Sequence, residues 1–325
     1  MPPPITVVIA LALVFDFLNG VHGSSNIVAT MVSSRAFRPW VALLIIGMAE
    51  FIGPFLFGVA VAETVGAQIV QAKVITFNIL IAALISCVAW NILTWLLGLP
   101  SSPSHGLVGG LIGATLLGAG FSALQLPGLI KVMIALFITP LISFGFGYAV
   151  TRLIFTMASH ASPRINEFFK QIQLVTAVLL ALSQGSNDAQ KAMGIIGLSL
   201  IIGGSLPAFS VPLWVMALSA AGMALGTVLS GAPLIRTLGG KFYKIRPVHS
   251  FSAQVSSLLL MIASSFLGLP VSTTQLVSSA IIGVGSSERL GKIRWSVASE
   301  ILVSWILTIP ATSMLAAGVY WLLVR

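Results

Sequence analysis

The sequence predicts an all-α integral membrane protein built from two repeats of opposite orientation, each with about five helical segments. Of its 325 residues, 57% are hydrophobic and only 7% are charged, whereas about 25% of the residues of a soluble domain are charged. Apolar runs repeatedly reach the roughly 20 residues that a helix needs to cross a bilayer. Inside lipid such runs must be helical, because only a helix satisfies its own backbone.

The apolar runs define ten helical segments, several of them short enough to be halves of broken helices or re-entrant hairpins. They cover residues 5–33, 41–62, 74–98, 104–122, 132–155, 171–203, 211–230, 250–268, 272–286 and 298–322. With alternating sides, twelve of the 16 Lys and Arg residues fall on one face and three on the other. The positive-inside rule then predicts a plasma (inner) membrane protein with both termini outside the cytoplasm. The net charge of +9 reflects this topology, and we expect no nucleic-acid partner.

Two pairs of motifs repeat along the chain. GLPSSPSHGLVGGLIG, which begins at Gly98, matches GLPVSTTQLVSSAIIG, which begins at Gly268, at an offset of 170. NGVHGSSN, from Asn19, aligns with QGSNDAQK, from Gln184, at an offset of 165. Each half crosses the membrane an odd number of times, so the second half is inverted relative to the first. Secondary transporters have this architecture, with the binding site at the midplane between the repeats.

The repeat also divides the chain. Residues 1–158 form the predicted first inverted repeat, and residues 171–325 form the second. The segment 159–170 between them is polar and is predicted to be a cytoplasmic linker.

The stretch LSQGSNDAQKAMGIIG places charged groups in the middle of an apolar segment. Asp188 and Lys191 are three residues apart and share one helix face, so they can pair. The glycines at 185, 194 and 197 are expected to loosen the helix and expose backbone. A charge at mid-membrane costs about 2.5–3.5 kcal/mol, which favours a functional role; the alternative is an ion pair that only ties helices together. In the partner motif, His22 and Asn26 supply polar groups without a carboxylate, although His22 could instead be a packed core residue.

The two GLP turns carry a different chemistry. Gly and Pro end one helix, and the Ser and Thr residues that follow are natural N-caps of the next. Each turn therefore presents hydroxyls and free N–H groups at the positive end of a helix dipole. Two such ends brought together would bind a small oxyanion; the alternative for either turn alone is an ordinary cap in a loop.

Two further acids lie within or at the start of apolar segments. Glu50 is in the middle of GMAEFIGPFLFG, and Glu300 opens the last segment. Either could serve a path for a cation or a proton, or could pack between helices as a hydrogen-bonded acid.

These motifs resemble those of the inorganic phosphate transporter family, in its bacterial branch. SQGSNDAQKAMGIIG is similar to the second-repeat signature of that family, and NGVHGSSNIVAT, followed by SSRAFRPW, is similar to the first. The resemblance runs through nearly the whole chain. It implies a symporter that imports inorganic phosphate with a cation, either sodium or a proton, commonly as a homodimer in contact with membrane lipid, and without an organic cofactor or a bound metal.

The resemblance and the residue patterns described above together give the candidate site residues. Those expected to bind substrate are Ser101, Ser102, Ser104, His105, Ser272, Thr273, Thr274, Gln275, His22, Asn26, Asn187 and Lys191. Those expected to couple the cation are Asp188, Asn187, Asn19, Glu50 and Glu300. The chain departs from the family at two places: the family usually has an acid at the position of Gly23 and a histidine at the position of Gln275. Without the acid at Gly23, Asp188 is expected to act alone.

Three other functions would use some of the same residues or the same membrane fold. A permease for sulfate or another tetrahedral oxyanion of the same fold would use the same donors. An intramembrane hydrolase would use Ser104, His105 and Asp188, but the first two are adjacent at a helix start and point apart. A passive channel would carry a flux that ignores sodium and pH gradients. We therefore expect a transporter and no enzymatic activity.

Overall fold

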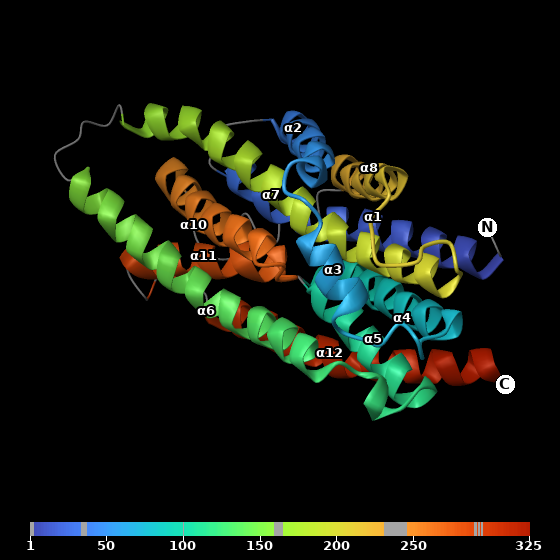
Figure 1. The fold of residues 1–325 in the computed structure, drawn as a ribbon. Helices are drawn as coiled ribbons and strands as arrows, with labels where there is room; N and C mark the ends of the chain where they lie inside the picture. The colour runs from blue at the N-terminus through green and yellow to red at the C-terminus, as the bar shows by residue number, and fades with distance from the viewer. Residues whose placement is uncertain are drawn as a thin grey trace.

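A computed structural model gives the structure of the chain, and it describes residues 3–33, 38–99, 101–158, 165–230, 246–288, 291, 293 and 295–325. Within these ranges the chain is almost entirely helical and has no named strand. The first half contains α1 (Pro3–Ser33), α2 (Pro39–Ile52), η1 (Gly53–Phe55), α3 (Ala60–Ala67), α4 (Phe77–Leu96), α5 (Pro103–Gly118), η2 (Phe121–Ala123) and α6 (Leu126–Met157). The second half contains α7 (Ile165–Ile202), α8 (Leu213–Leu229), α10 (Pro247–Phe266), α11 (Thr273–Glu288) and α12 (Trp295–Val324). Figure 1 shows them as one bundle of long, roughly aligned helices.

Five of the described helices are long and apolar enough to cross a membrane, or up to six if a bent pair counts as one span. The five stretches are Pro3–Gly23, Phe77–Leu96, Leu126–Met157, Ile165–Ile202 and Ala298–Val324. Their outer faces expose many large apolar side chains, for example Leu141 at 72% and Leu322 at 68%. An apolar surface of this extent belongs in lipid. The chain is a multi-pass membrane protein, as predicted.

The sequence predicted a single helical segment over residues 41–62, but the structure breaks this segment between α2 and α3. The helical stretch Pro39–Phe55 and α3 are bent by 73° relative to each other. Pro54 lies at the bend, and Gly58 adopts a φ of +74°, a conformation that a side chain would strain. The chain therefore turns sharply at this point.

The predicted loosening of α7 is wrong. α7 runs without interruption for 38 residues through the whole polar stretch. Its glycines instead allow close packing: a Cβ on Gly185 would lie 2.2 Å from the carbonyl oxygen of Glu50, and one on Gly194 would lie 2.7 Å from that of Ala62. The helix keeps its hydrogen bonds, and the missing side chains let α2 and α3 approach it.

The two GLP motifs form matching helical hairpins. Gly98, between α4 and α5, has a φ of +65°, and Gly268, between α10 and α11, has a φ of +64°. Both α5 and α11 have 16 residues, fewer than the roughly 20 that a full span needs. The predicted short hairpin halves are thus present at both places.

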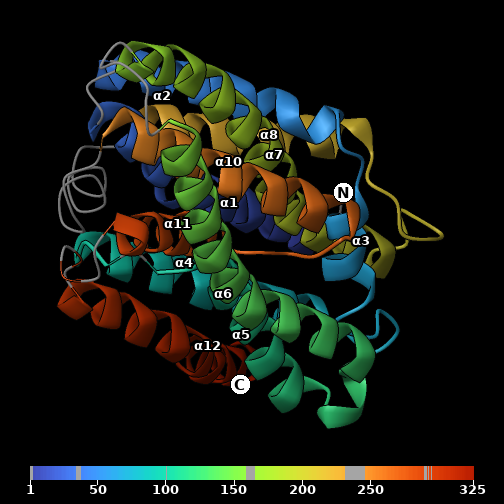
Figure 2. The same ribbon diagram turned by 90° about the vertical axis from the view of Figure 1, so that its left-hand side faces the viewer.

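Each short helix packs along a long helix of the other half. α5 lies along α12, and α11 lies along α6 (Figure 2). The long helices contain Pro140 and Pro310 at the same offset of 170. The two halves are thereby interleaved, so that the starts of α5 and α11 meet inside the bundle.

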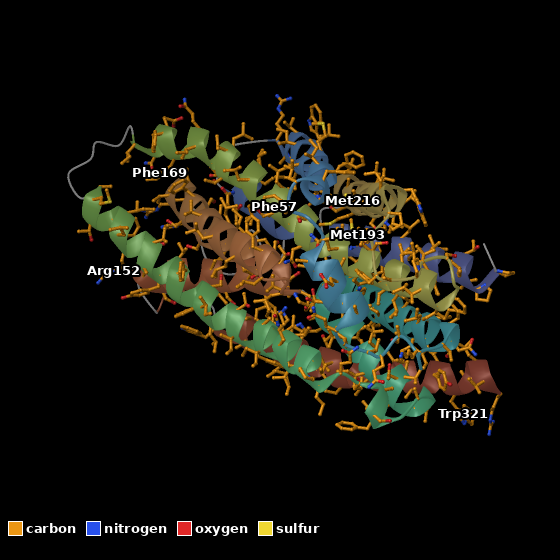
Figure 3. All side chains as sticks on the ribbon, viewed as in Figure 1. Phe57, Arg152, Phe169, Met193, Met216 and Trp321 are labelled. Atoms are coloured by element: carbon orange, nitrogen blue, oxygen red, sulfur yellow. The ribbon has the colours of Figure 1, made fainter. Side chains whose placement is uncertain are left out.

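A polar layer separates two apolar cores. On α1, Ile5 to Phe15 belong to one core and Ile27 to Met31 to the other. On α7, Ala177 to Ala181 belong to the second core, and the buried residues from Ala189 to Leu200 to the first. In Figure 3, Phe169 near the start of α7 and Met193 beyond its polar stretch show the course of this helix through the bundle. The polar layer holds the residues predicted to form the site.

Candidate functional site

Asp188 and Lys191 form an ion pair at the centre of the polar layer. The Lys191 ammonium donates to one carboxylate oxygen of Asp188. Both side chains are almost fully buried, with exposed fractions of 1–2%. Removing two charges from water is costly and is offset only by good geometry and further hydrogen bonds. The surroundings of the pair supply those bonds.

The starts of α5 and α11 both reach this ion pair. Lys191 donates to the hydroxyl of Ser104 at 2.6 Å and to the carbonyl oxygen of Val271 at 2.7 Å. Thr273 donates from its hydroxyl to the second carboxylate oxygen of Asp188 at 2.7 Å. Ser104 in turn donates to the Val271 carbonyl at 3.0 Å. One pair of charges on α7 therefore joins the two hairpins.

Both helix starts are capped by serine hydroxyls, as the sequence suggested. Ser102 accepts a hydrogen bond from the backbone N–H of His105 at 3.2 Å, and Ser272 accepts one from that of Gln275 at 3.4 Å. The imidazole Nδ1 of His105 also lies 2.7 Å from the Ser102 hydroxyl. A capped N-terminus keeps its partial positive charge directed at whatever lies in front of it.

The two ends touch through the residues at equivalent repeat positions. The Nε2 atoms of Gln275 and His105 are 3.3 Å apart, and both residues are buried. Ser101 bonds to the hydroxyl of Thr94 at 2.6 Å, and Thr274 is 2% exposed. Of the eight candidates in the two turns, Ser104 and Thr273 therefore bond directly to the ion pair. A second set of hydrogen bonds joins Ser102, His105, Gln275 and Ser272 across the two helix starts.

Asn187 anchors the second hairpin to α7. Its amide Nδ2 donates to the carbonyl oxygen of Leu269 at 3.0 Å and to the hydroxyl of Ser265 at 3.3 Å. Its Oδ1 is buried and has no hydrogen-bond partner among the described residues. The amide oxygen is thus available as a ligand for a cation or a donor.

α1 also contributes residues next to Asp188. Asn19 donates from Nδ2 to the backbone oxygen of Asp188 at 3.4 Å, and His22 bonds through Nδ1 to the Leu18 carbonyl at 2.9 Å. A Cβ on Gly23 would lie 3.4 Å from the Asp188 carboxylate. Gly23 therefore faces its repeat partner directly. The side chain of Asn26 lies outside the described residues.

The two outlying acids occupy different environments. Glu50 on α2 is fully buried, and the hydroxyl of Thr227 on α8 donates to its Oε2. Glu300 is exposed near the start of α12. Of the two, only Glu50 is enclosed in the bundle.

The sequence interpretation missed two buried polar residues beside the site. Asp16 on α1 is 0% exposed, and Gln184 on α7 has both amide atoms buried without a partner among the described residues. A Cβ on Gly23 would lie 2.5 Å from the Gln184 amide nitrogen. The signal for Asp16 was available, since an acid inside an apolar run is a candidate functional group by default.

The geometry does not support a hydrolase. The Ser104 hydroxyl is engaged by Lys191 and Val271, and the His105 ring bonds to Ser102 instead. A nucleophile and its base must lie within hydrogen-bonding reach of each other. No such pair forms between Ser104 and His105.

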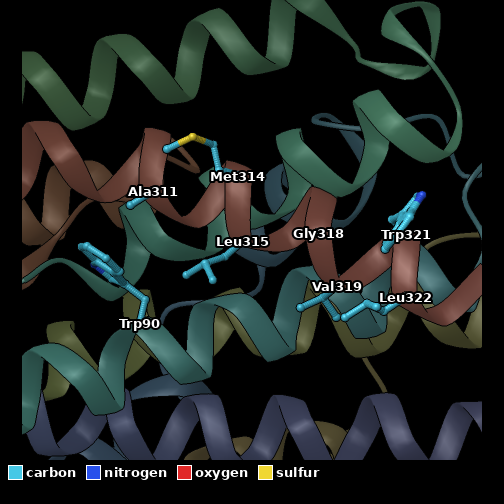
Figure 4. Close-up of a pocket in the computed structure, with 8 residues that line it drawn as sticks. All are labelled: Trp90, Ala311, Met314, Leu315, Gly318, Val319, Trp321 and Leu322. Atoms are coloured by element: carbon cyan, nitrogen blue, oxygen red, sulfur yellow. The ribbon is translucent and has the colours of Figure 1, made fainter.

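A groove on the outside of the bundle has a different character. It is lined by Trp90 of α4 and by α12 residues from Ala311 to Leu322, and its volume is about 620 Å³ (Figure 4). Its lining residues are almost entirely apolar, and none of them belongs to the polar layer. We assign the groove no role in binding the anion.

Comparison with known proteins decides the family. The sequence profile of the phosphate transporter family matches residues 19–316. The chain belongs to the phosphate transporter family. It is 40% identical over 322 residues to a Bacillus subtilis protein named "probable low-affinity inorganic phosphate transporter", with 97% of this chain and 96% of the relative covered. A Rhizobium meliloti protein of the same name is 40% identical over 325 residues, with 98% and 96% covered.

The fold is also shared with a solved structure. A structure described as "the sodium-dependent phosphate transporter" superposes with a TM-score of 0.87 and covers 98% of both chains, at 23% identity. The relatives are named as transporters, and no catalytic family is indicated. The predicted resemblance to the inorganic phosphate transporter family is confirmed.

Proposed function

We propose that this member of the phosphate transporter family imports inorganic phosphate by symport with a cation, through alternating access between two inverted repeats, residues 1–158 and 171–325. The observation that carries the proposal is the meeting of two hydroxyl-capped helix starts at one buried ion pair. Helix N-termini bind oxyanions through free N–H groups and the helix dipole. Ser102 and Ser104 on one side, with Thr273 on the other, supply hydroxyls in addition.

Lys191 is the proposed switch between the two ligands. In the structure it is held by Asp188, Ser104 and Val271. A cation that neutralises Asp188 would weaken its hold on the ammonium, and Lys191 could then attract the anion. Phosphate and the cation would therefore be bound together, because each removes a charge that opposes the other.

The cation site is proposed to include Asp188, Asn187 and Asn19. Asp188 supplies the negative charge, and the unpartnered Oδ1 of Asn187 supplies a neutral oxygen. Asn19 is placed at the Asp188 backbone by its hydrogen bond. A sodium-dependent structural neighbour supports a coupled cation, and both sodium and a proton fit the residues.

Uptake measurements in proteoliposomes test the proposal. Radiolabelled phosphate uptake is measured with a sodium gradient alone, a pH gradient alone, and neither. We expect one of the two gradients to drive phosphate accumulation by the wild-type protein. We expect the Asp188→Asn variant to insert into the membrane but to accumulate no phosphate. Accumulation in Asp188→Asn equal to wild type would remove Asp188 from the mechanism, and a flux that ignores both gradients would indicate a channel.

The same preparation distinguishes phosphate from sulfate. Unlabelled sulfate and unlabelled phosphate are added in turn to compete with labelled phosphate. We expect only phosphate to compete at equal concentration; stronger competition by sulfate would favour the alternative permease.

The proposed placement in the plasma membrane, with both termini outside and two copies per assembly, can be checked by surface labelling of the termini and by cross-linking.

A further inference from the structure

Asp16 is a buried carboxyl that the proposed transport mechanism leaves unused. It lies on α1 with 0% of its surface exposed, and neither carboxyl oxygen has a hydrogen-bond partner among the described residues. Ser219 of α8 is its neighbouring side-chain hydroxyl, and this hydroxyl is likewise buried and unpartnered within the described part of the chain. A buried carboxyl with a single neighbouring hydroxyl inside a membrane protein points to a function.

The carboxyl is held in a tight interface between two helices. A Cβ on Gly222 of α8 would lie 3.4 Å from the Cβ of Asp16, and one on Gly226 would lie 1.9 Å from the carbonyl oxygen of Phe17. α8 carries no ionisable side chain over Leu213–Leu229. Lipid and bulk water are therefore kept away from this face of Asp16.

Asp16 is nevertheless electrostatically linked to the site. Asp188 and Lys191 of α7 both act on its carboxyl, the first by repulsion and the second by attraction. Other helices that contact α1 also carry ionisable groups, namely Glu50 on α2, Cys87 on α4, His105 on α5, His249 on α10 and Glu288 on α11, and α1 itself carries His22. A change of charge on Asp188 is thus felt at Asp16.

Asp16 lies on α1 about two turns from the position where the repeat would place a second carboxylate. Gly23 is the repeat partner of Asp188 at the offset of 165, so the first half lacks the carboxylate that the second half has. Asp16 precedes Gly23 by seven residues, or about two helical turns, and therefore lies on the same face of α1. α1 therefore carries its one acid two turns away from the position equivalent to Asp188.

We propose that Asp16 is a proton-binding site that takes up and releases one proton in each transport cycle, in concert with cation binding at Asp188. This inference rests on the proposed symport function. One carboxyl beside one hydroxyl suits a proton, whereas hard metal cations are held by several oxygen ligands. Protonated Asp16 donates to the Ser219 oxygen, and ionised Asp16 accepts from the Ser219 hydroxyl. The proton comes from water on one side and returns to water on the other, and no other bond changes.

The test compares pH-driven uptake with phosphate exchange in Asp16→Asn proteoliposomes. Asparagine has nearly the same volume and binds no proton. Two rates are measured for each variant: uptake of labelled phosphate driven by a pH gradient at equal sodium on both sides, and exchange of labelled for unlabelled phosphate without any gradient. The ratio of the two rates isolates coupling from the ability to bind phosphate.

We expect this ratio to fall by about tenfold or more in Asp16→Asn. Glu63→Gln, which neutralises an exposed acid on α3, is the matched control and should keep the wild-type ratio. An unchanged ratio in Asp16→Asn overturns the proposal. A variant that keeps its response to pH but loses its response to sodium also overturns it, because Asp16 would then bind sodium.

Two further variants keep the test decisive if Asp16→Asn fails to fold. Asp16→Glu keeps an acid and is expected to retain pH-driven uptake with a shifted pH dependence, while Ser219→Ala should shift it as well. If Asp16→Asn fails to insert, an unshifted pH dependence in both of these variants overturns the proposal. Failure of the proposed function looks different, since wild-type protein would then exchange no phosphate at all.

Discussion

The ammonium of Lys191 donates a hydrogen bond of 2.6 Å to the hydroxyl of Ser104, although 87 positions separate the two residues in the chain. Lys191 is on α7 of the second half, and Ser104 is in the first turn of α5 in the first half. A single side chain thus connects the two halves where their polar residues meet. The same ammonium also donates to the carboxylate of Asp188.

The ion pair should behave as one unit in a double-mutant cycle. Removing one partner of a buried pair leaves an uncompensated charge and costs about 3–5 kcal/mol. We expect Lys191→Met to lower the thermal unfolding midpoint of the purified protein strongly, and Asp188→Asn added to it to restore most of the loss. Phosphate uptake should stay absent in the double variant. A double variant that shows the sum of two separate losses would argue against direct coupling.

Thr273 should tune the affinity for the cation through its hydroxyl. A hydrogen bond to a charged group contributes about 1.5–3 kcal/mol. Thr273→Val keeps the shape but removes the donor to Asp188. We expect it to change the cation concentration for half-maximal uptake by about tenfold or more, whereas Thr273→Ser should remain near wild type. Equal behaviour of the two variants would show that the hydroxyl is irrelevant.

Glu50 and Glu300 should respond differently to neutralisation. Glu50 is buried and bonded to Thr227, and Glu300 is exposed. We expect Glu50→Gln to reduce gradient-driven phosphate uptake by about tenfold, and Glu300→Gln to have little effect. The measurement is initial uptake normalised to inserted protein. A large loss in Glu300→Gln with none in Glu50→Gln would reverse the assignment of the two acids.

Close packing at Gly53 can be tested as a stability effect. A Cβ at this position would lie 2.0 Å from the carbonyl oxygen of Leu182, and overpacking of this kind costs about 1–3 kcal/mol. We expect Gly53→Ala to lower the thermal unfolding midpoint. Gly145→Ala is the control, because nothing lies within 4 Å of its Cβ and alanine favours helix by about 1 kcal/mol. Equal midpoints for the two variants would contradict the packing argument.

The fold class was predictable because composition and repeat are both global signals. The low charged fraction required a membrane, and the offset of 170 predicted the two hairpins at Gly98 and Gly268. The local conformation of α7 was not predictable in the same way. A glycine such as Gly185 permits either a loosened helix or close approach of a neighbour, and only the position of Glu50 on α2 decides between them. The opposite orientation of the halves stays a prediction.

The sequence predicted the site residues that lie in repeated motifs and missed Asp16, which lies outside them. Asp188, Lys191 and Thr273 lie in repeated motifs, and the structure brings their side chains together. Asp16 precedes the first motif and has no acidic repeat partner, so the offset of 165 does not mark it. Its relation to α8 depends on helix packing, which no spacing within α1 reveals.

The mutual neutralisation of Asp188 and Lys191 has a consequence for turnover. A transporter that moves substrate in one direction must return to its starting conformation without substrate. An unpaired charge inside the membrane would hinder that conformational change. Without substrate, the ammonium of Lys191 is paired with Asp188 and donates to the Ser104 hydroxyl and the Val271 carbonyl. The substrate-free protein therefore has no unpaired charge at this point. In the proposed transport cycle, the protein would therefore return to its starting conformation without bound substrate, which net uptake requires and one-for-one exchange does not.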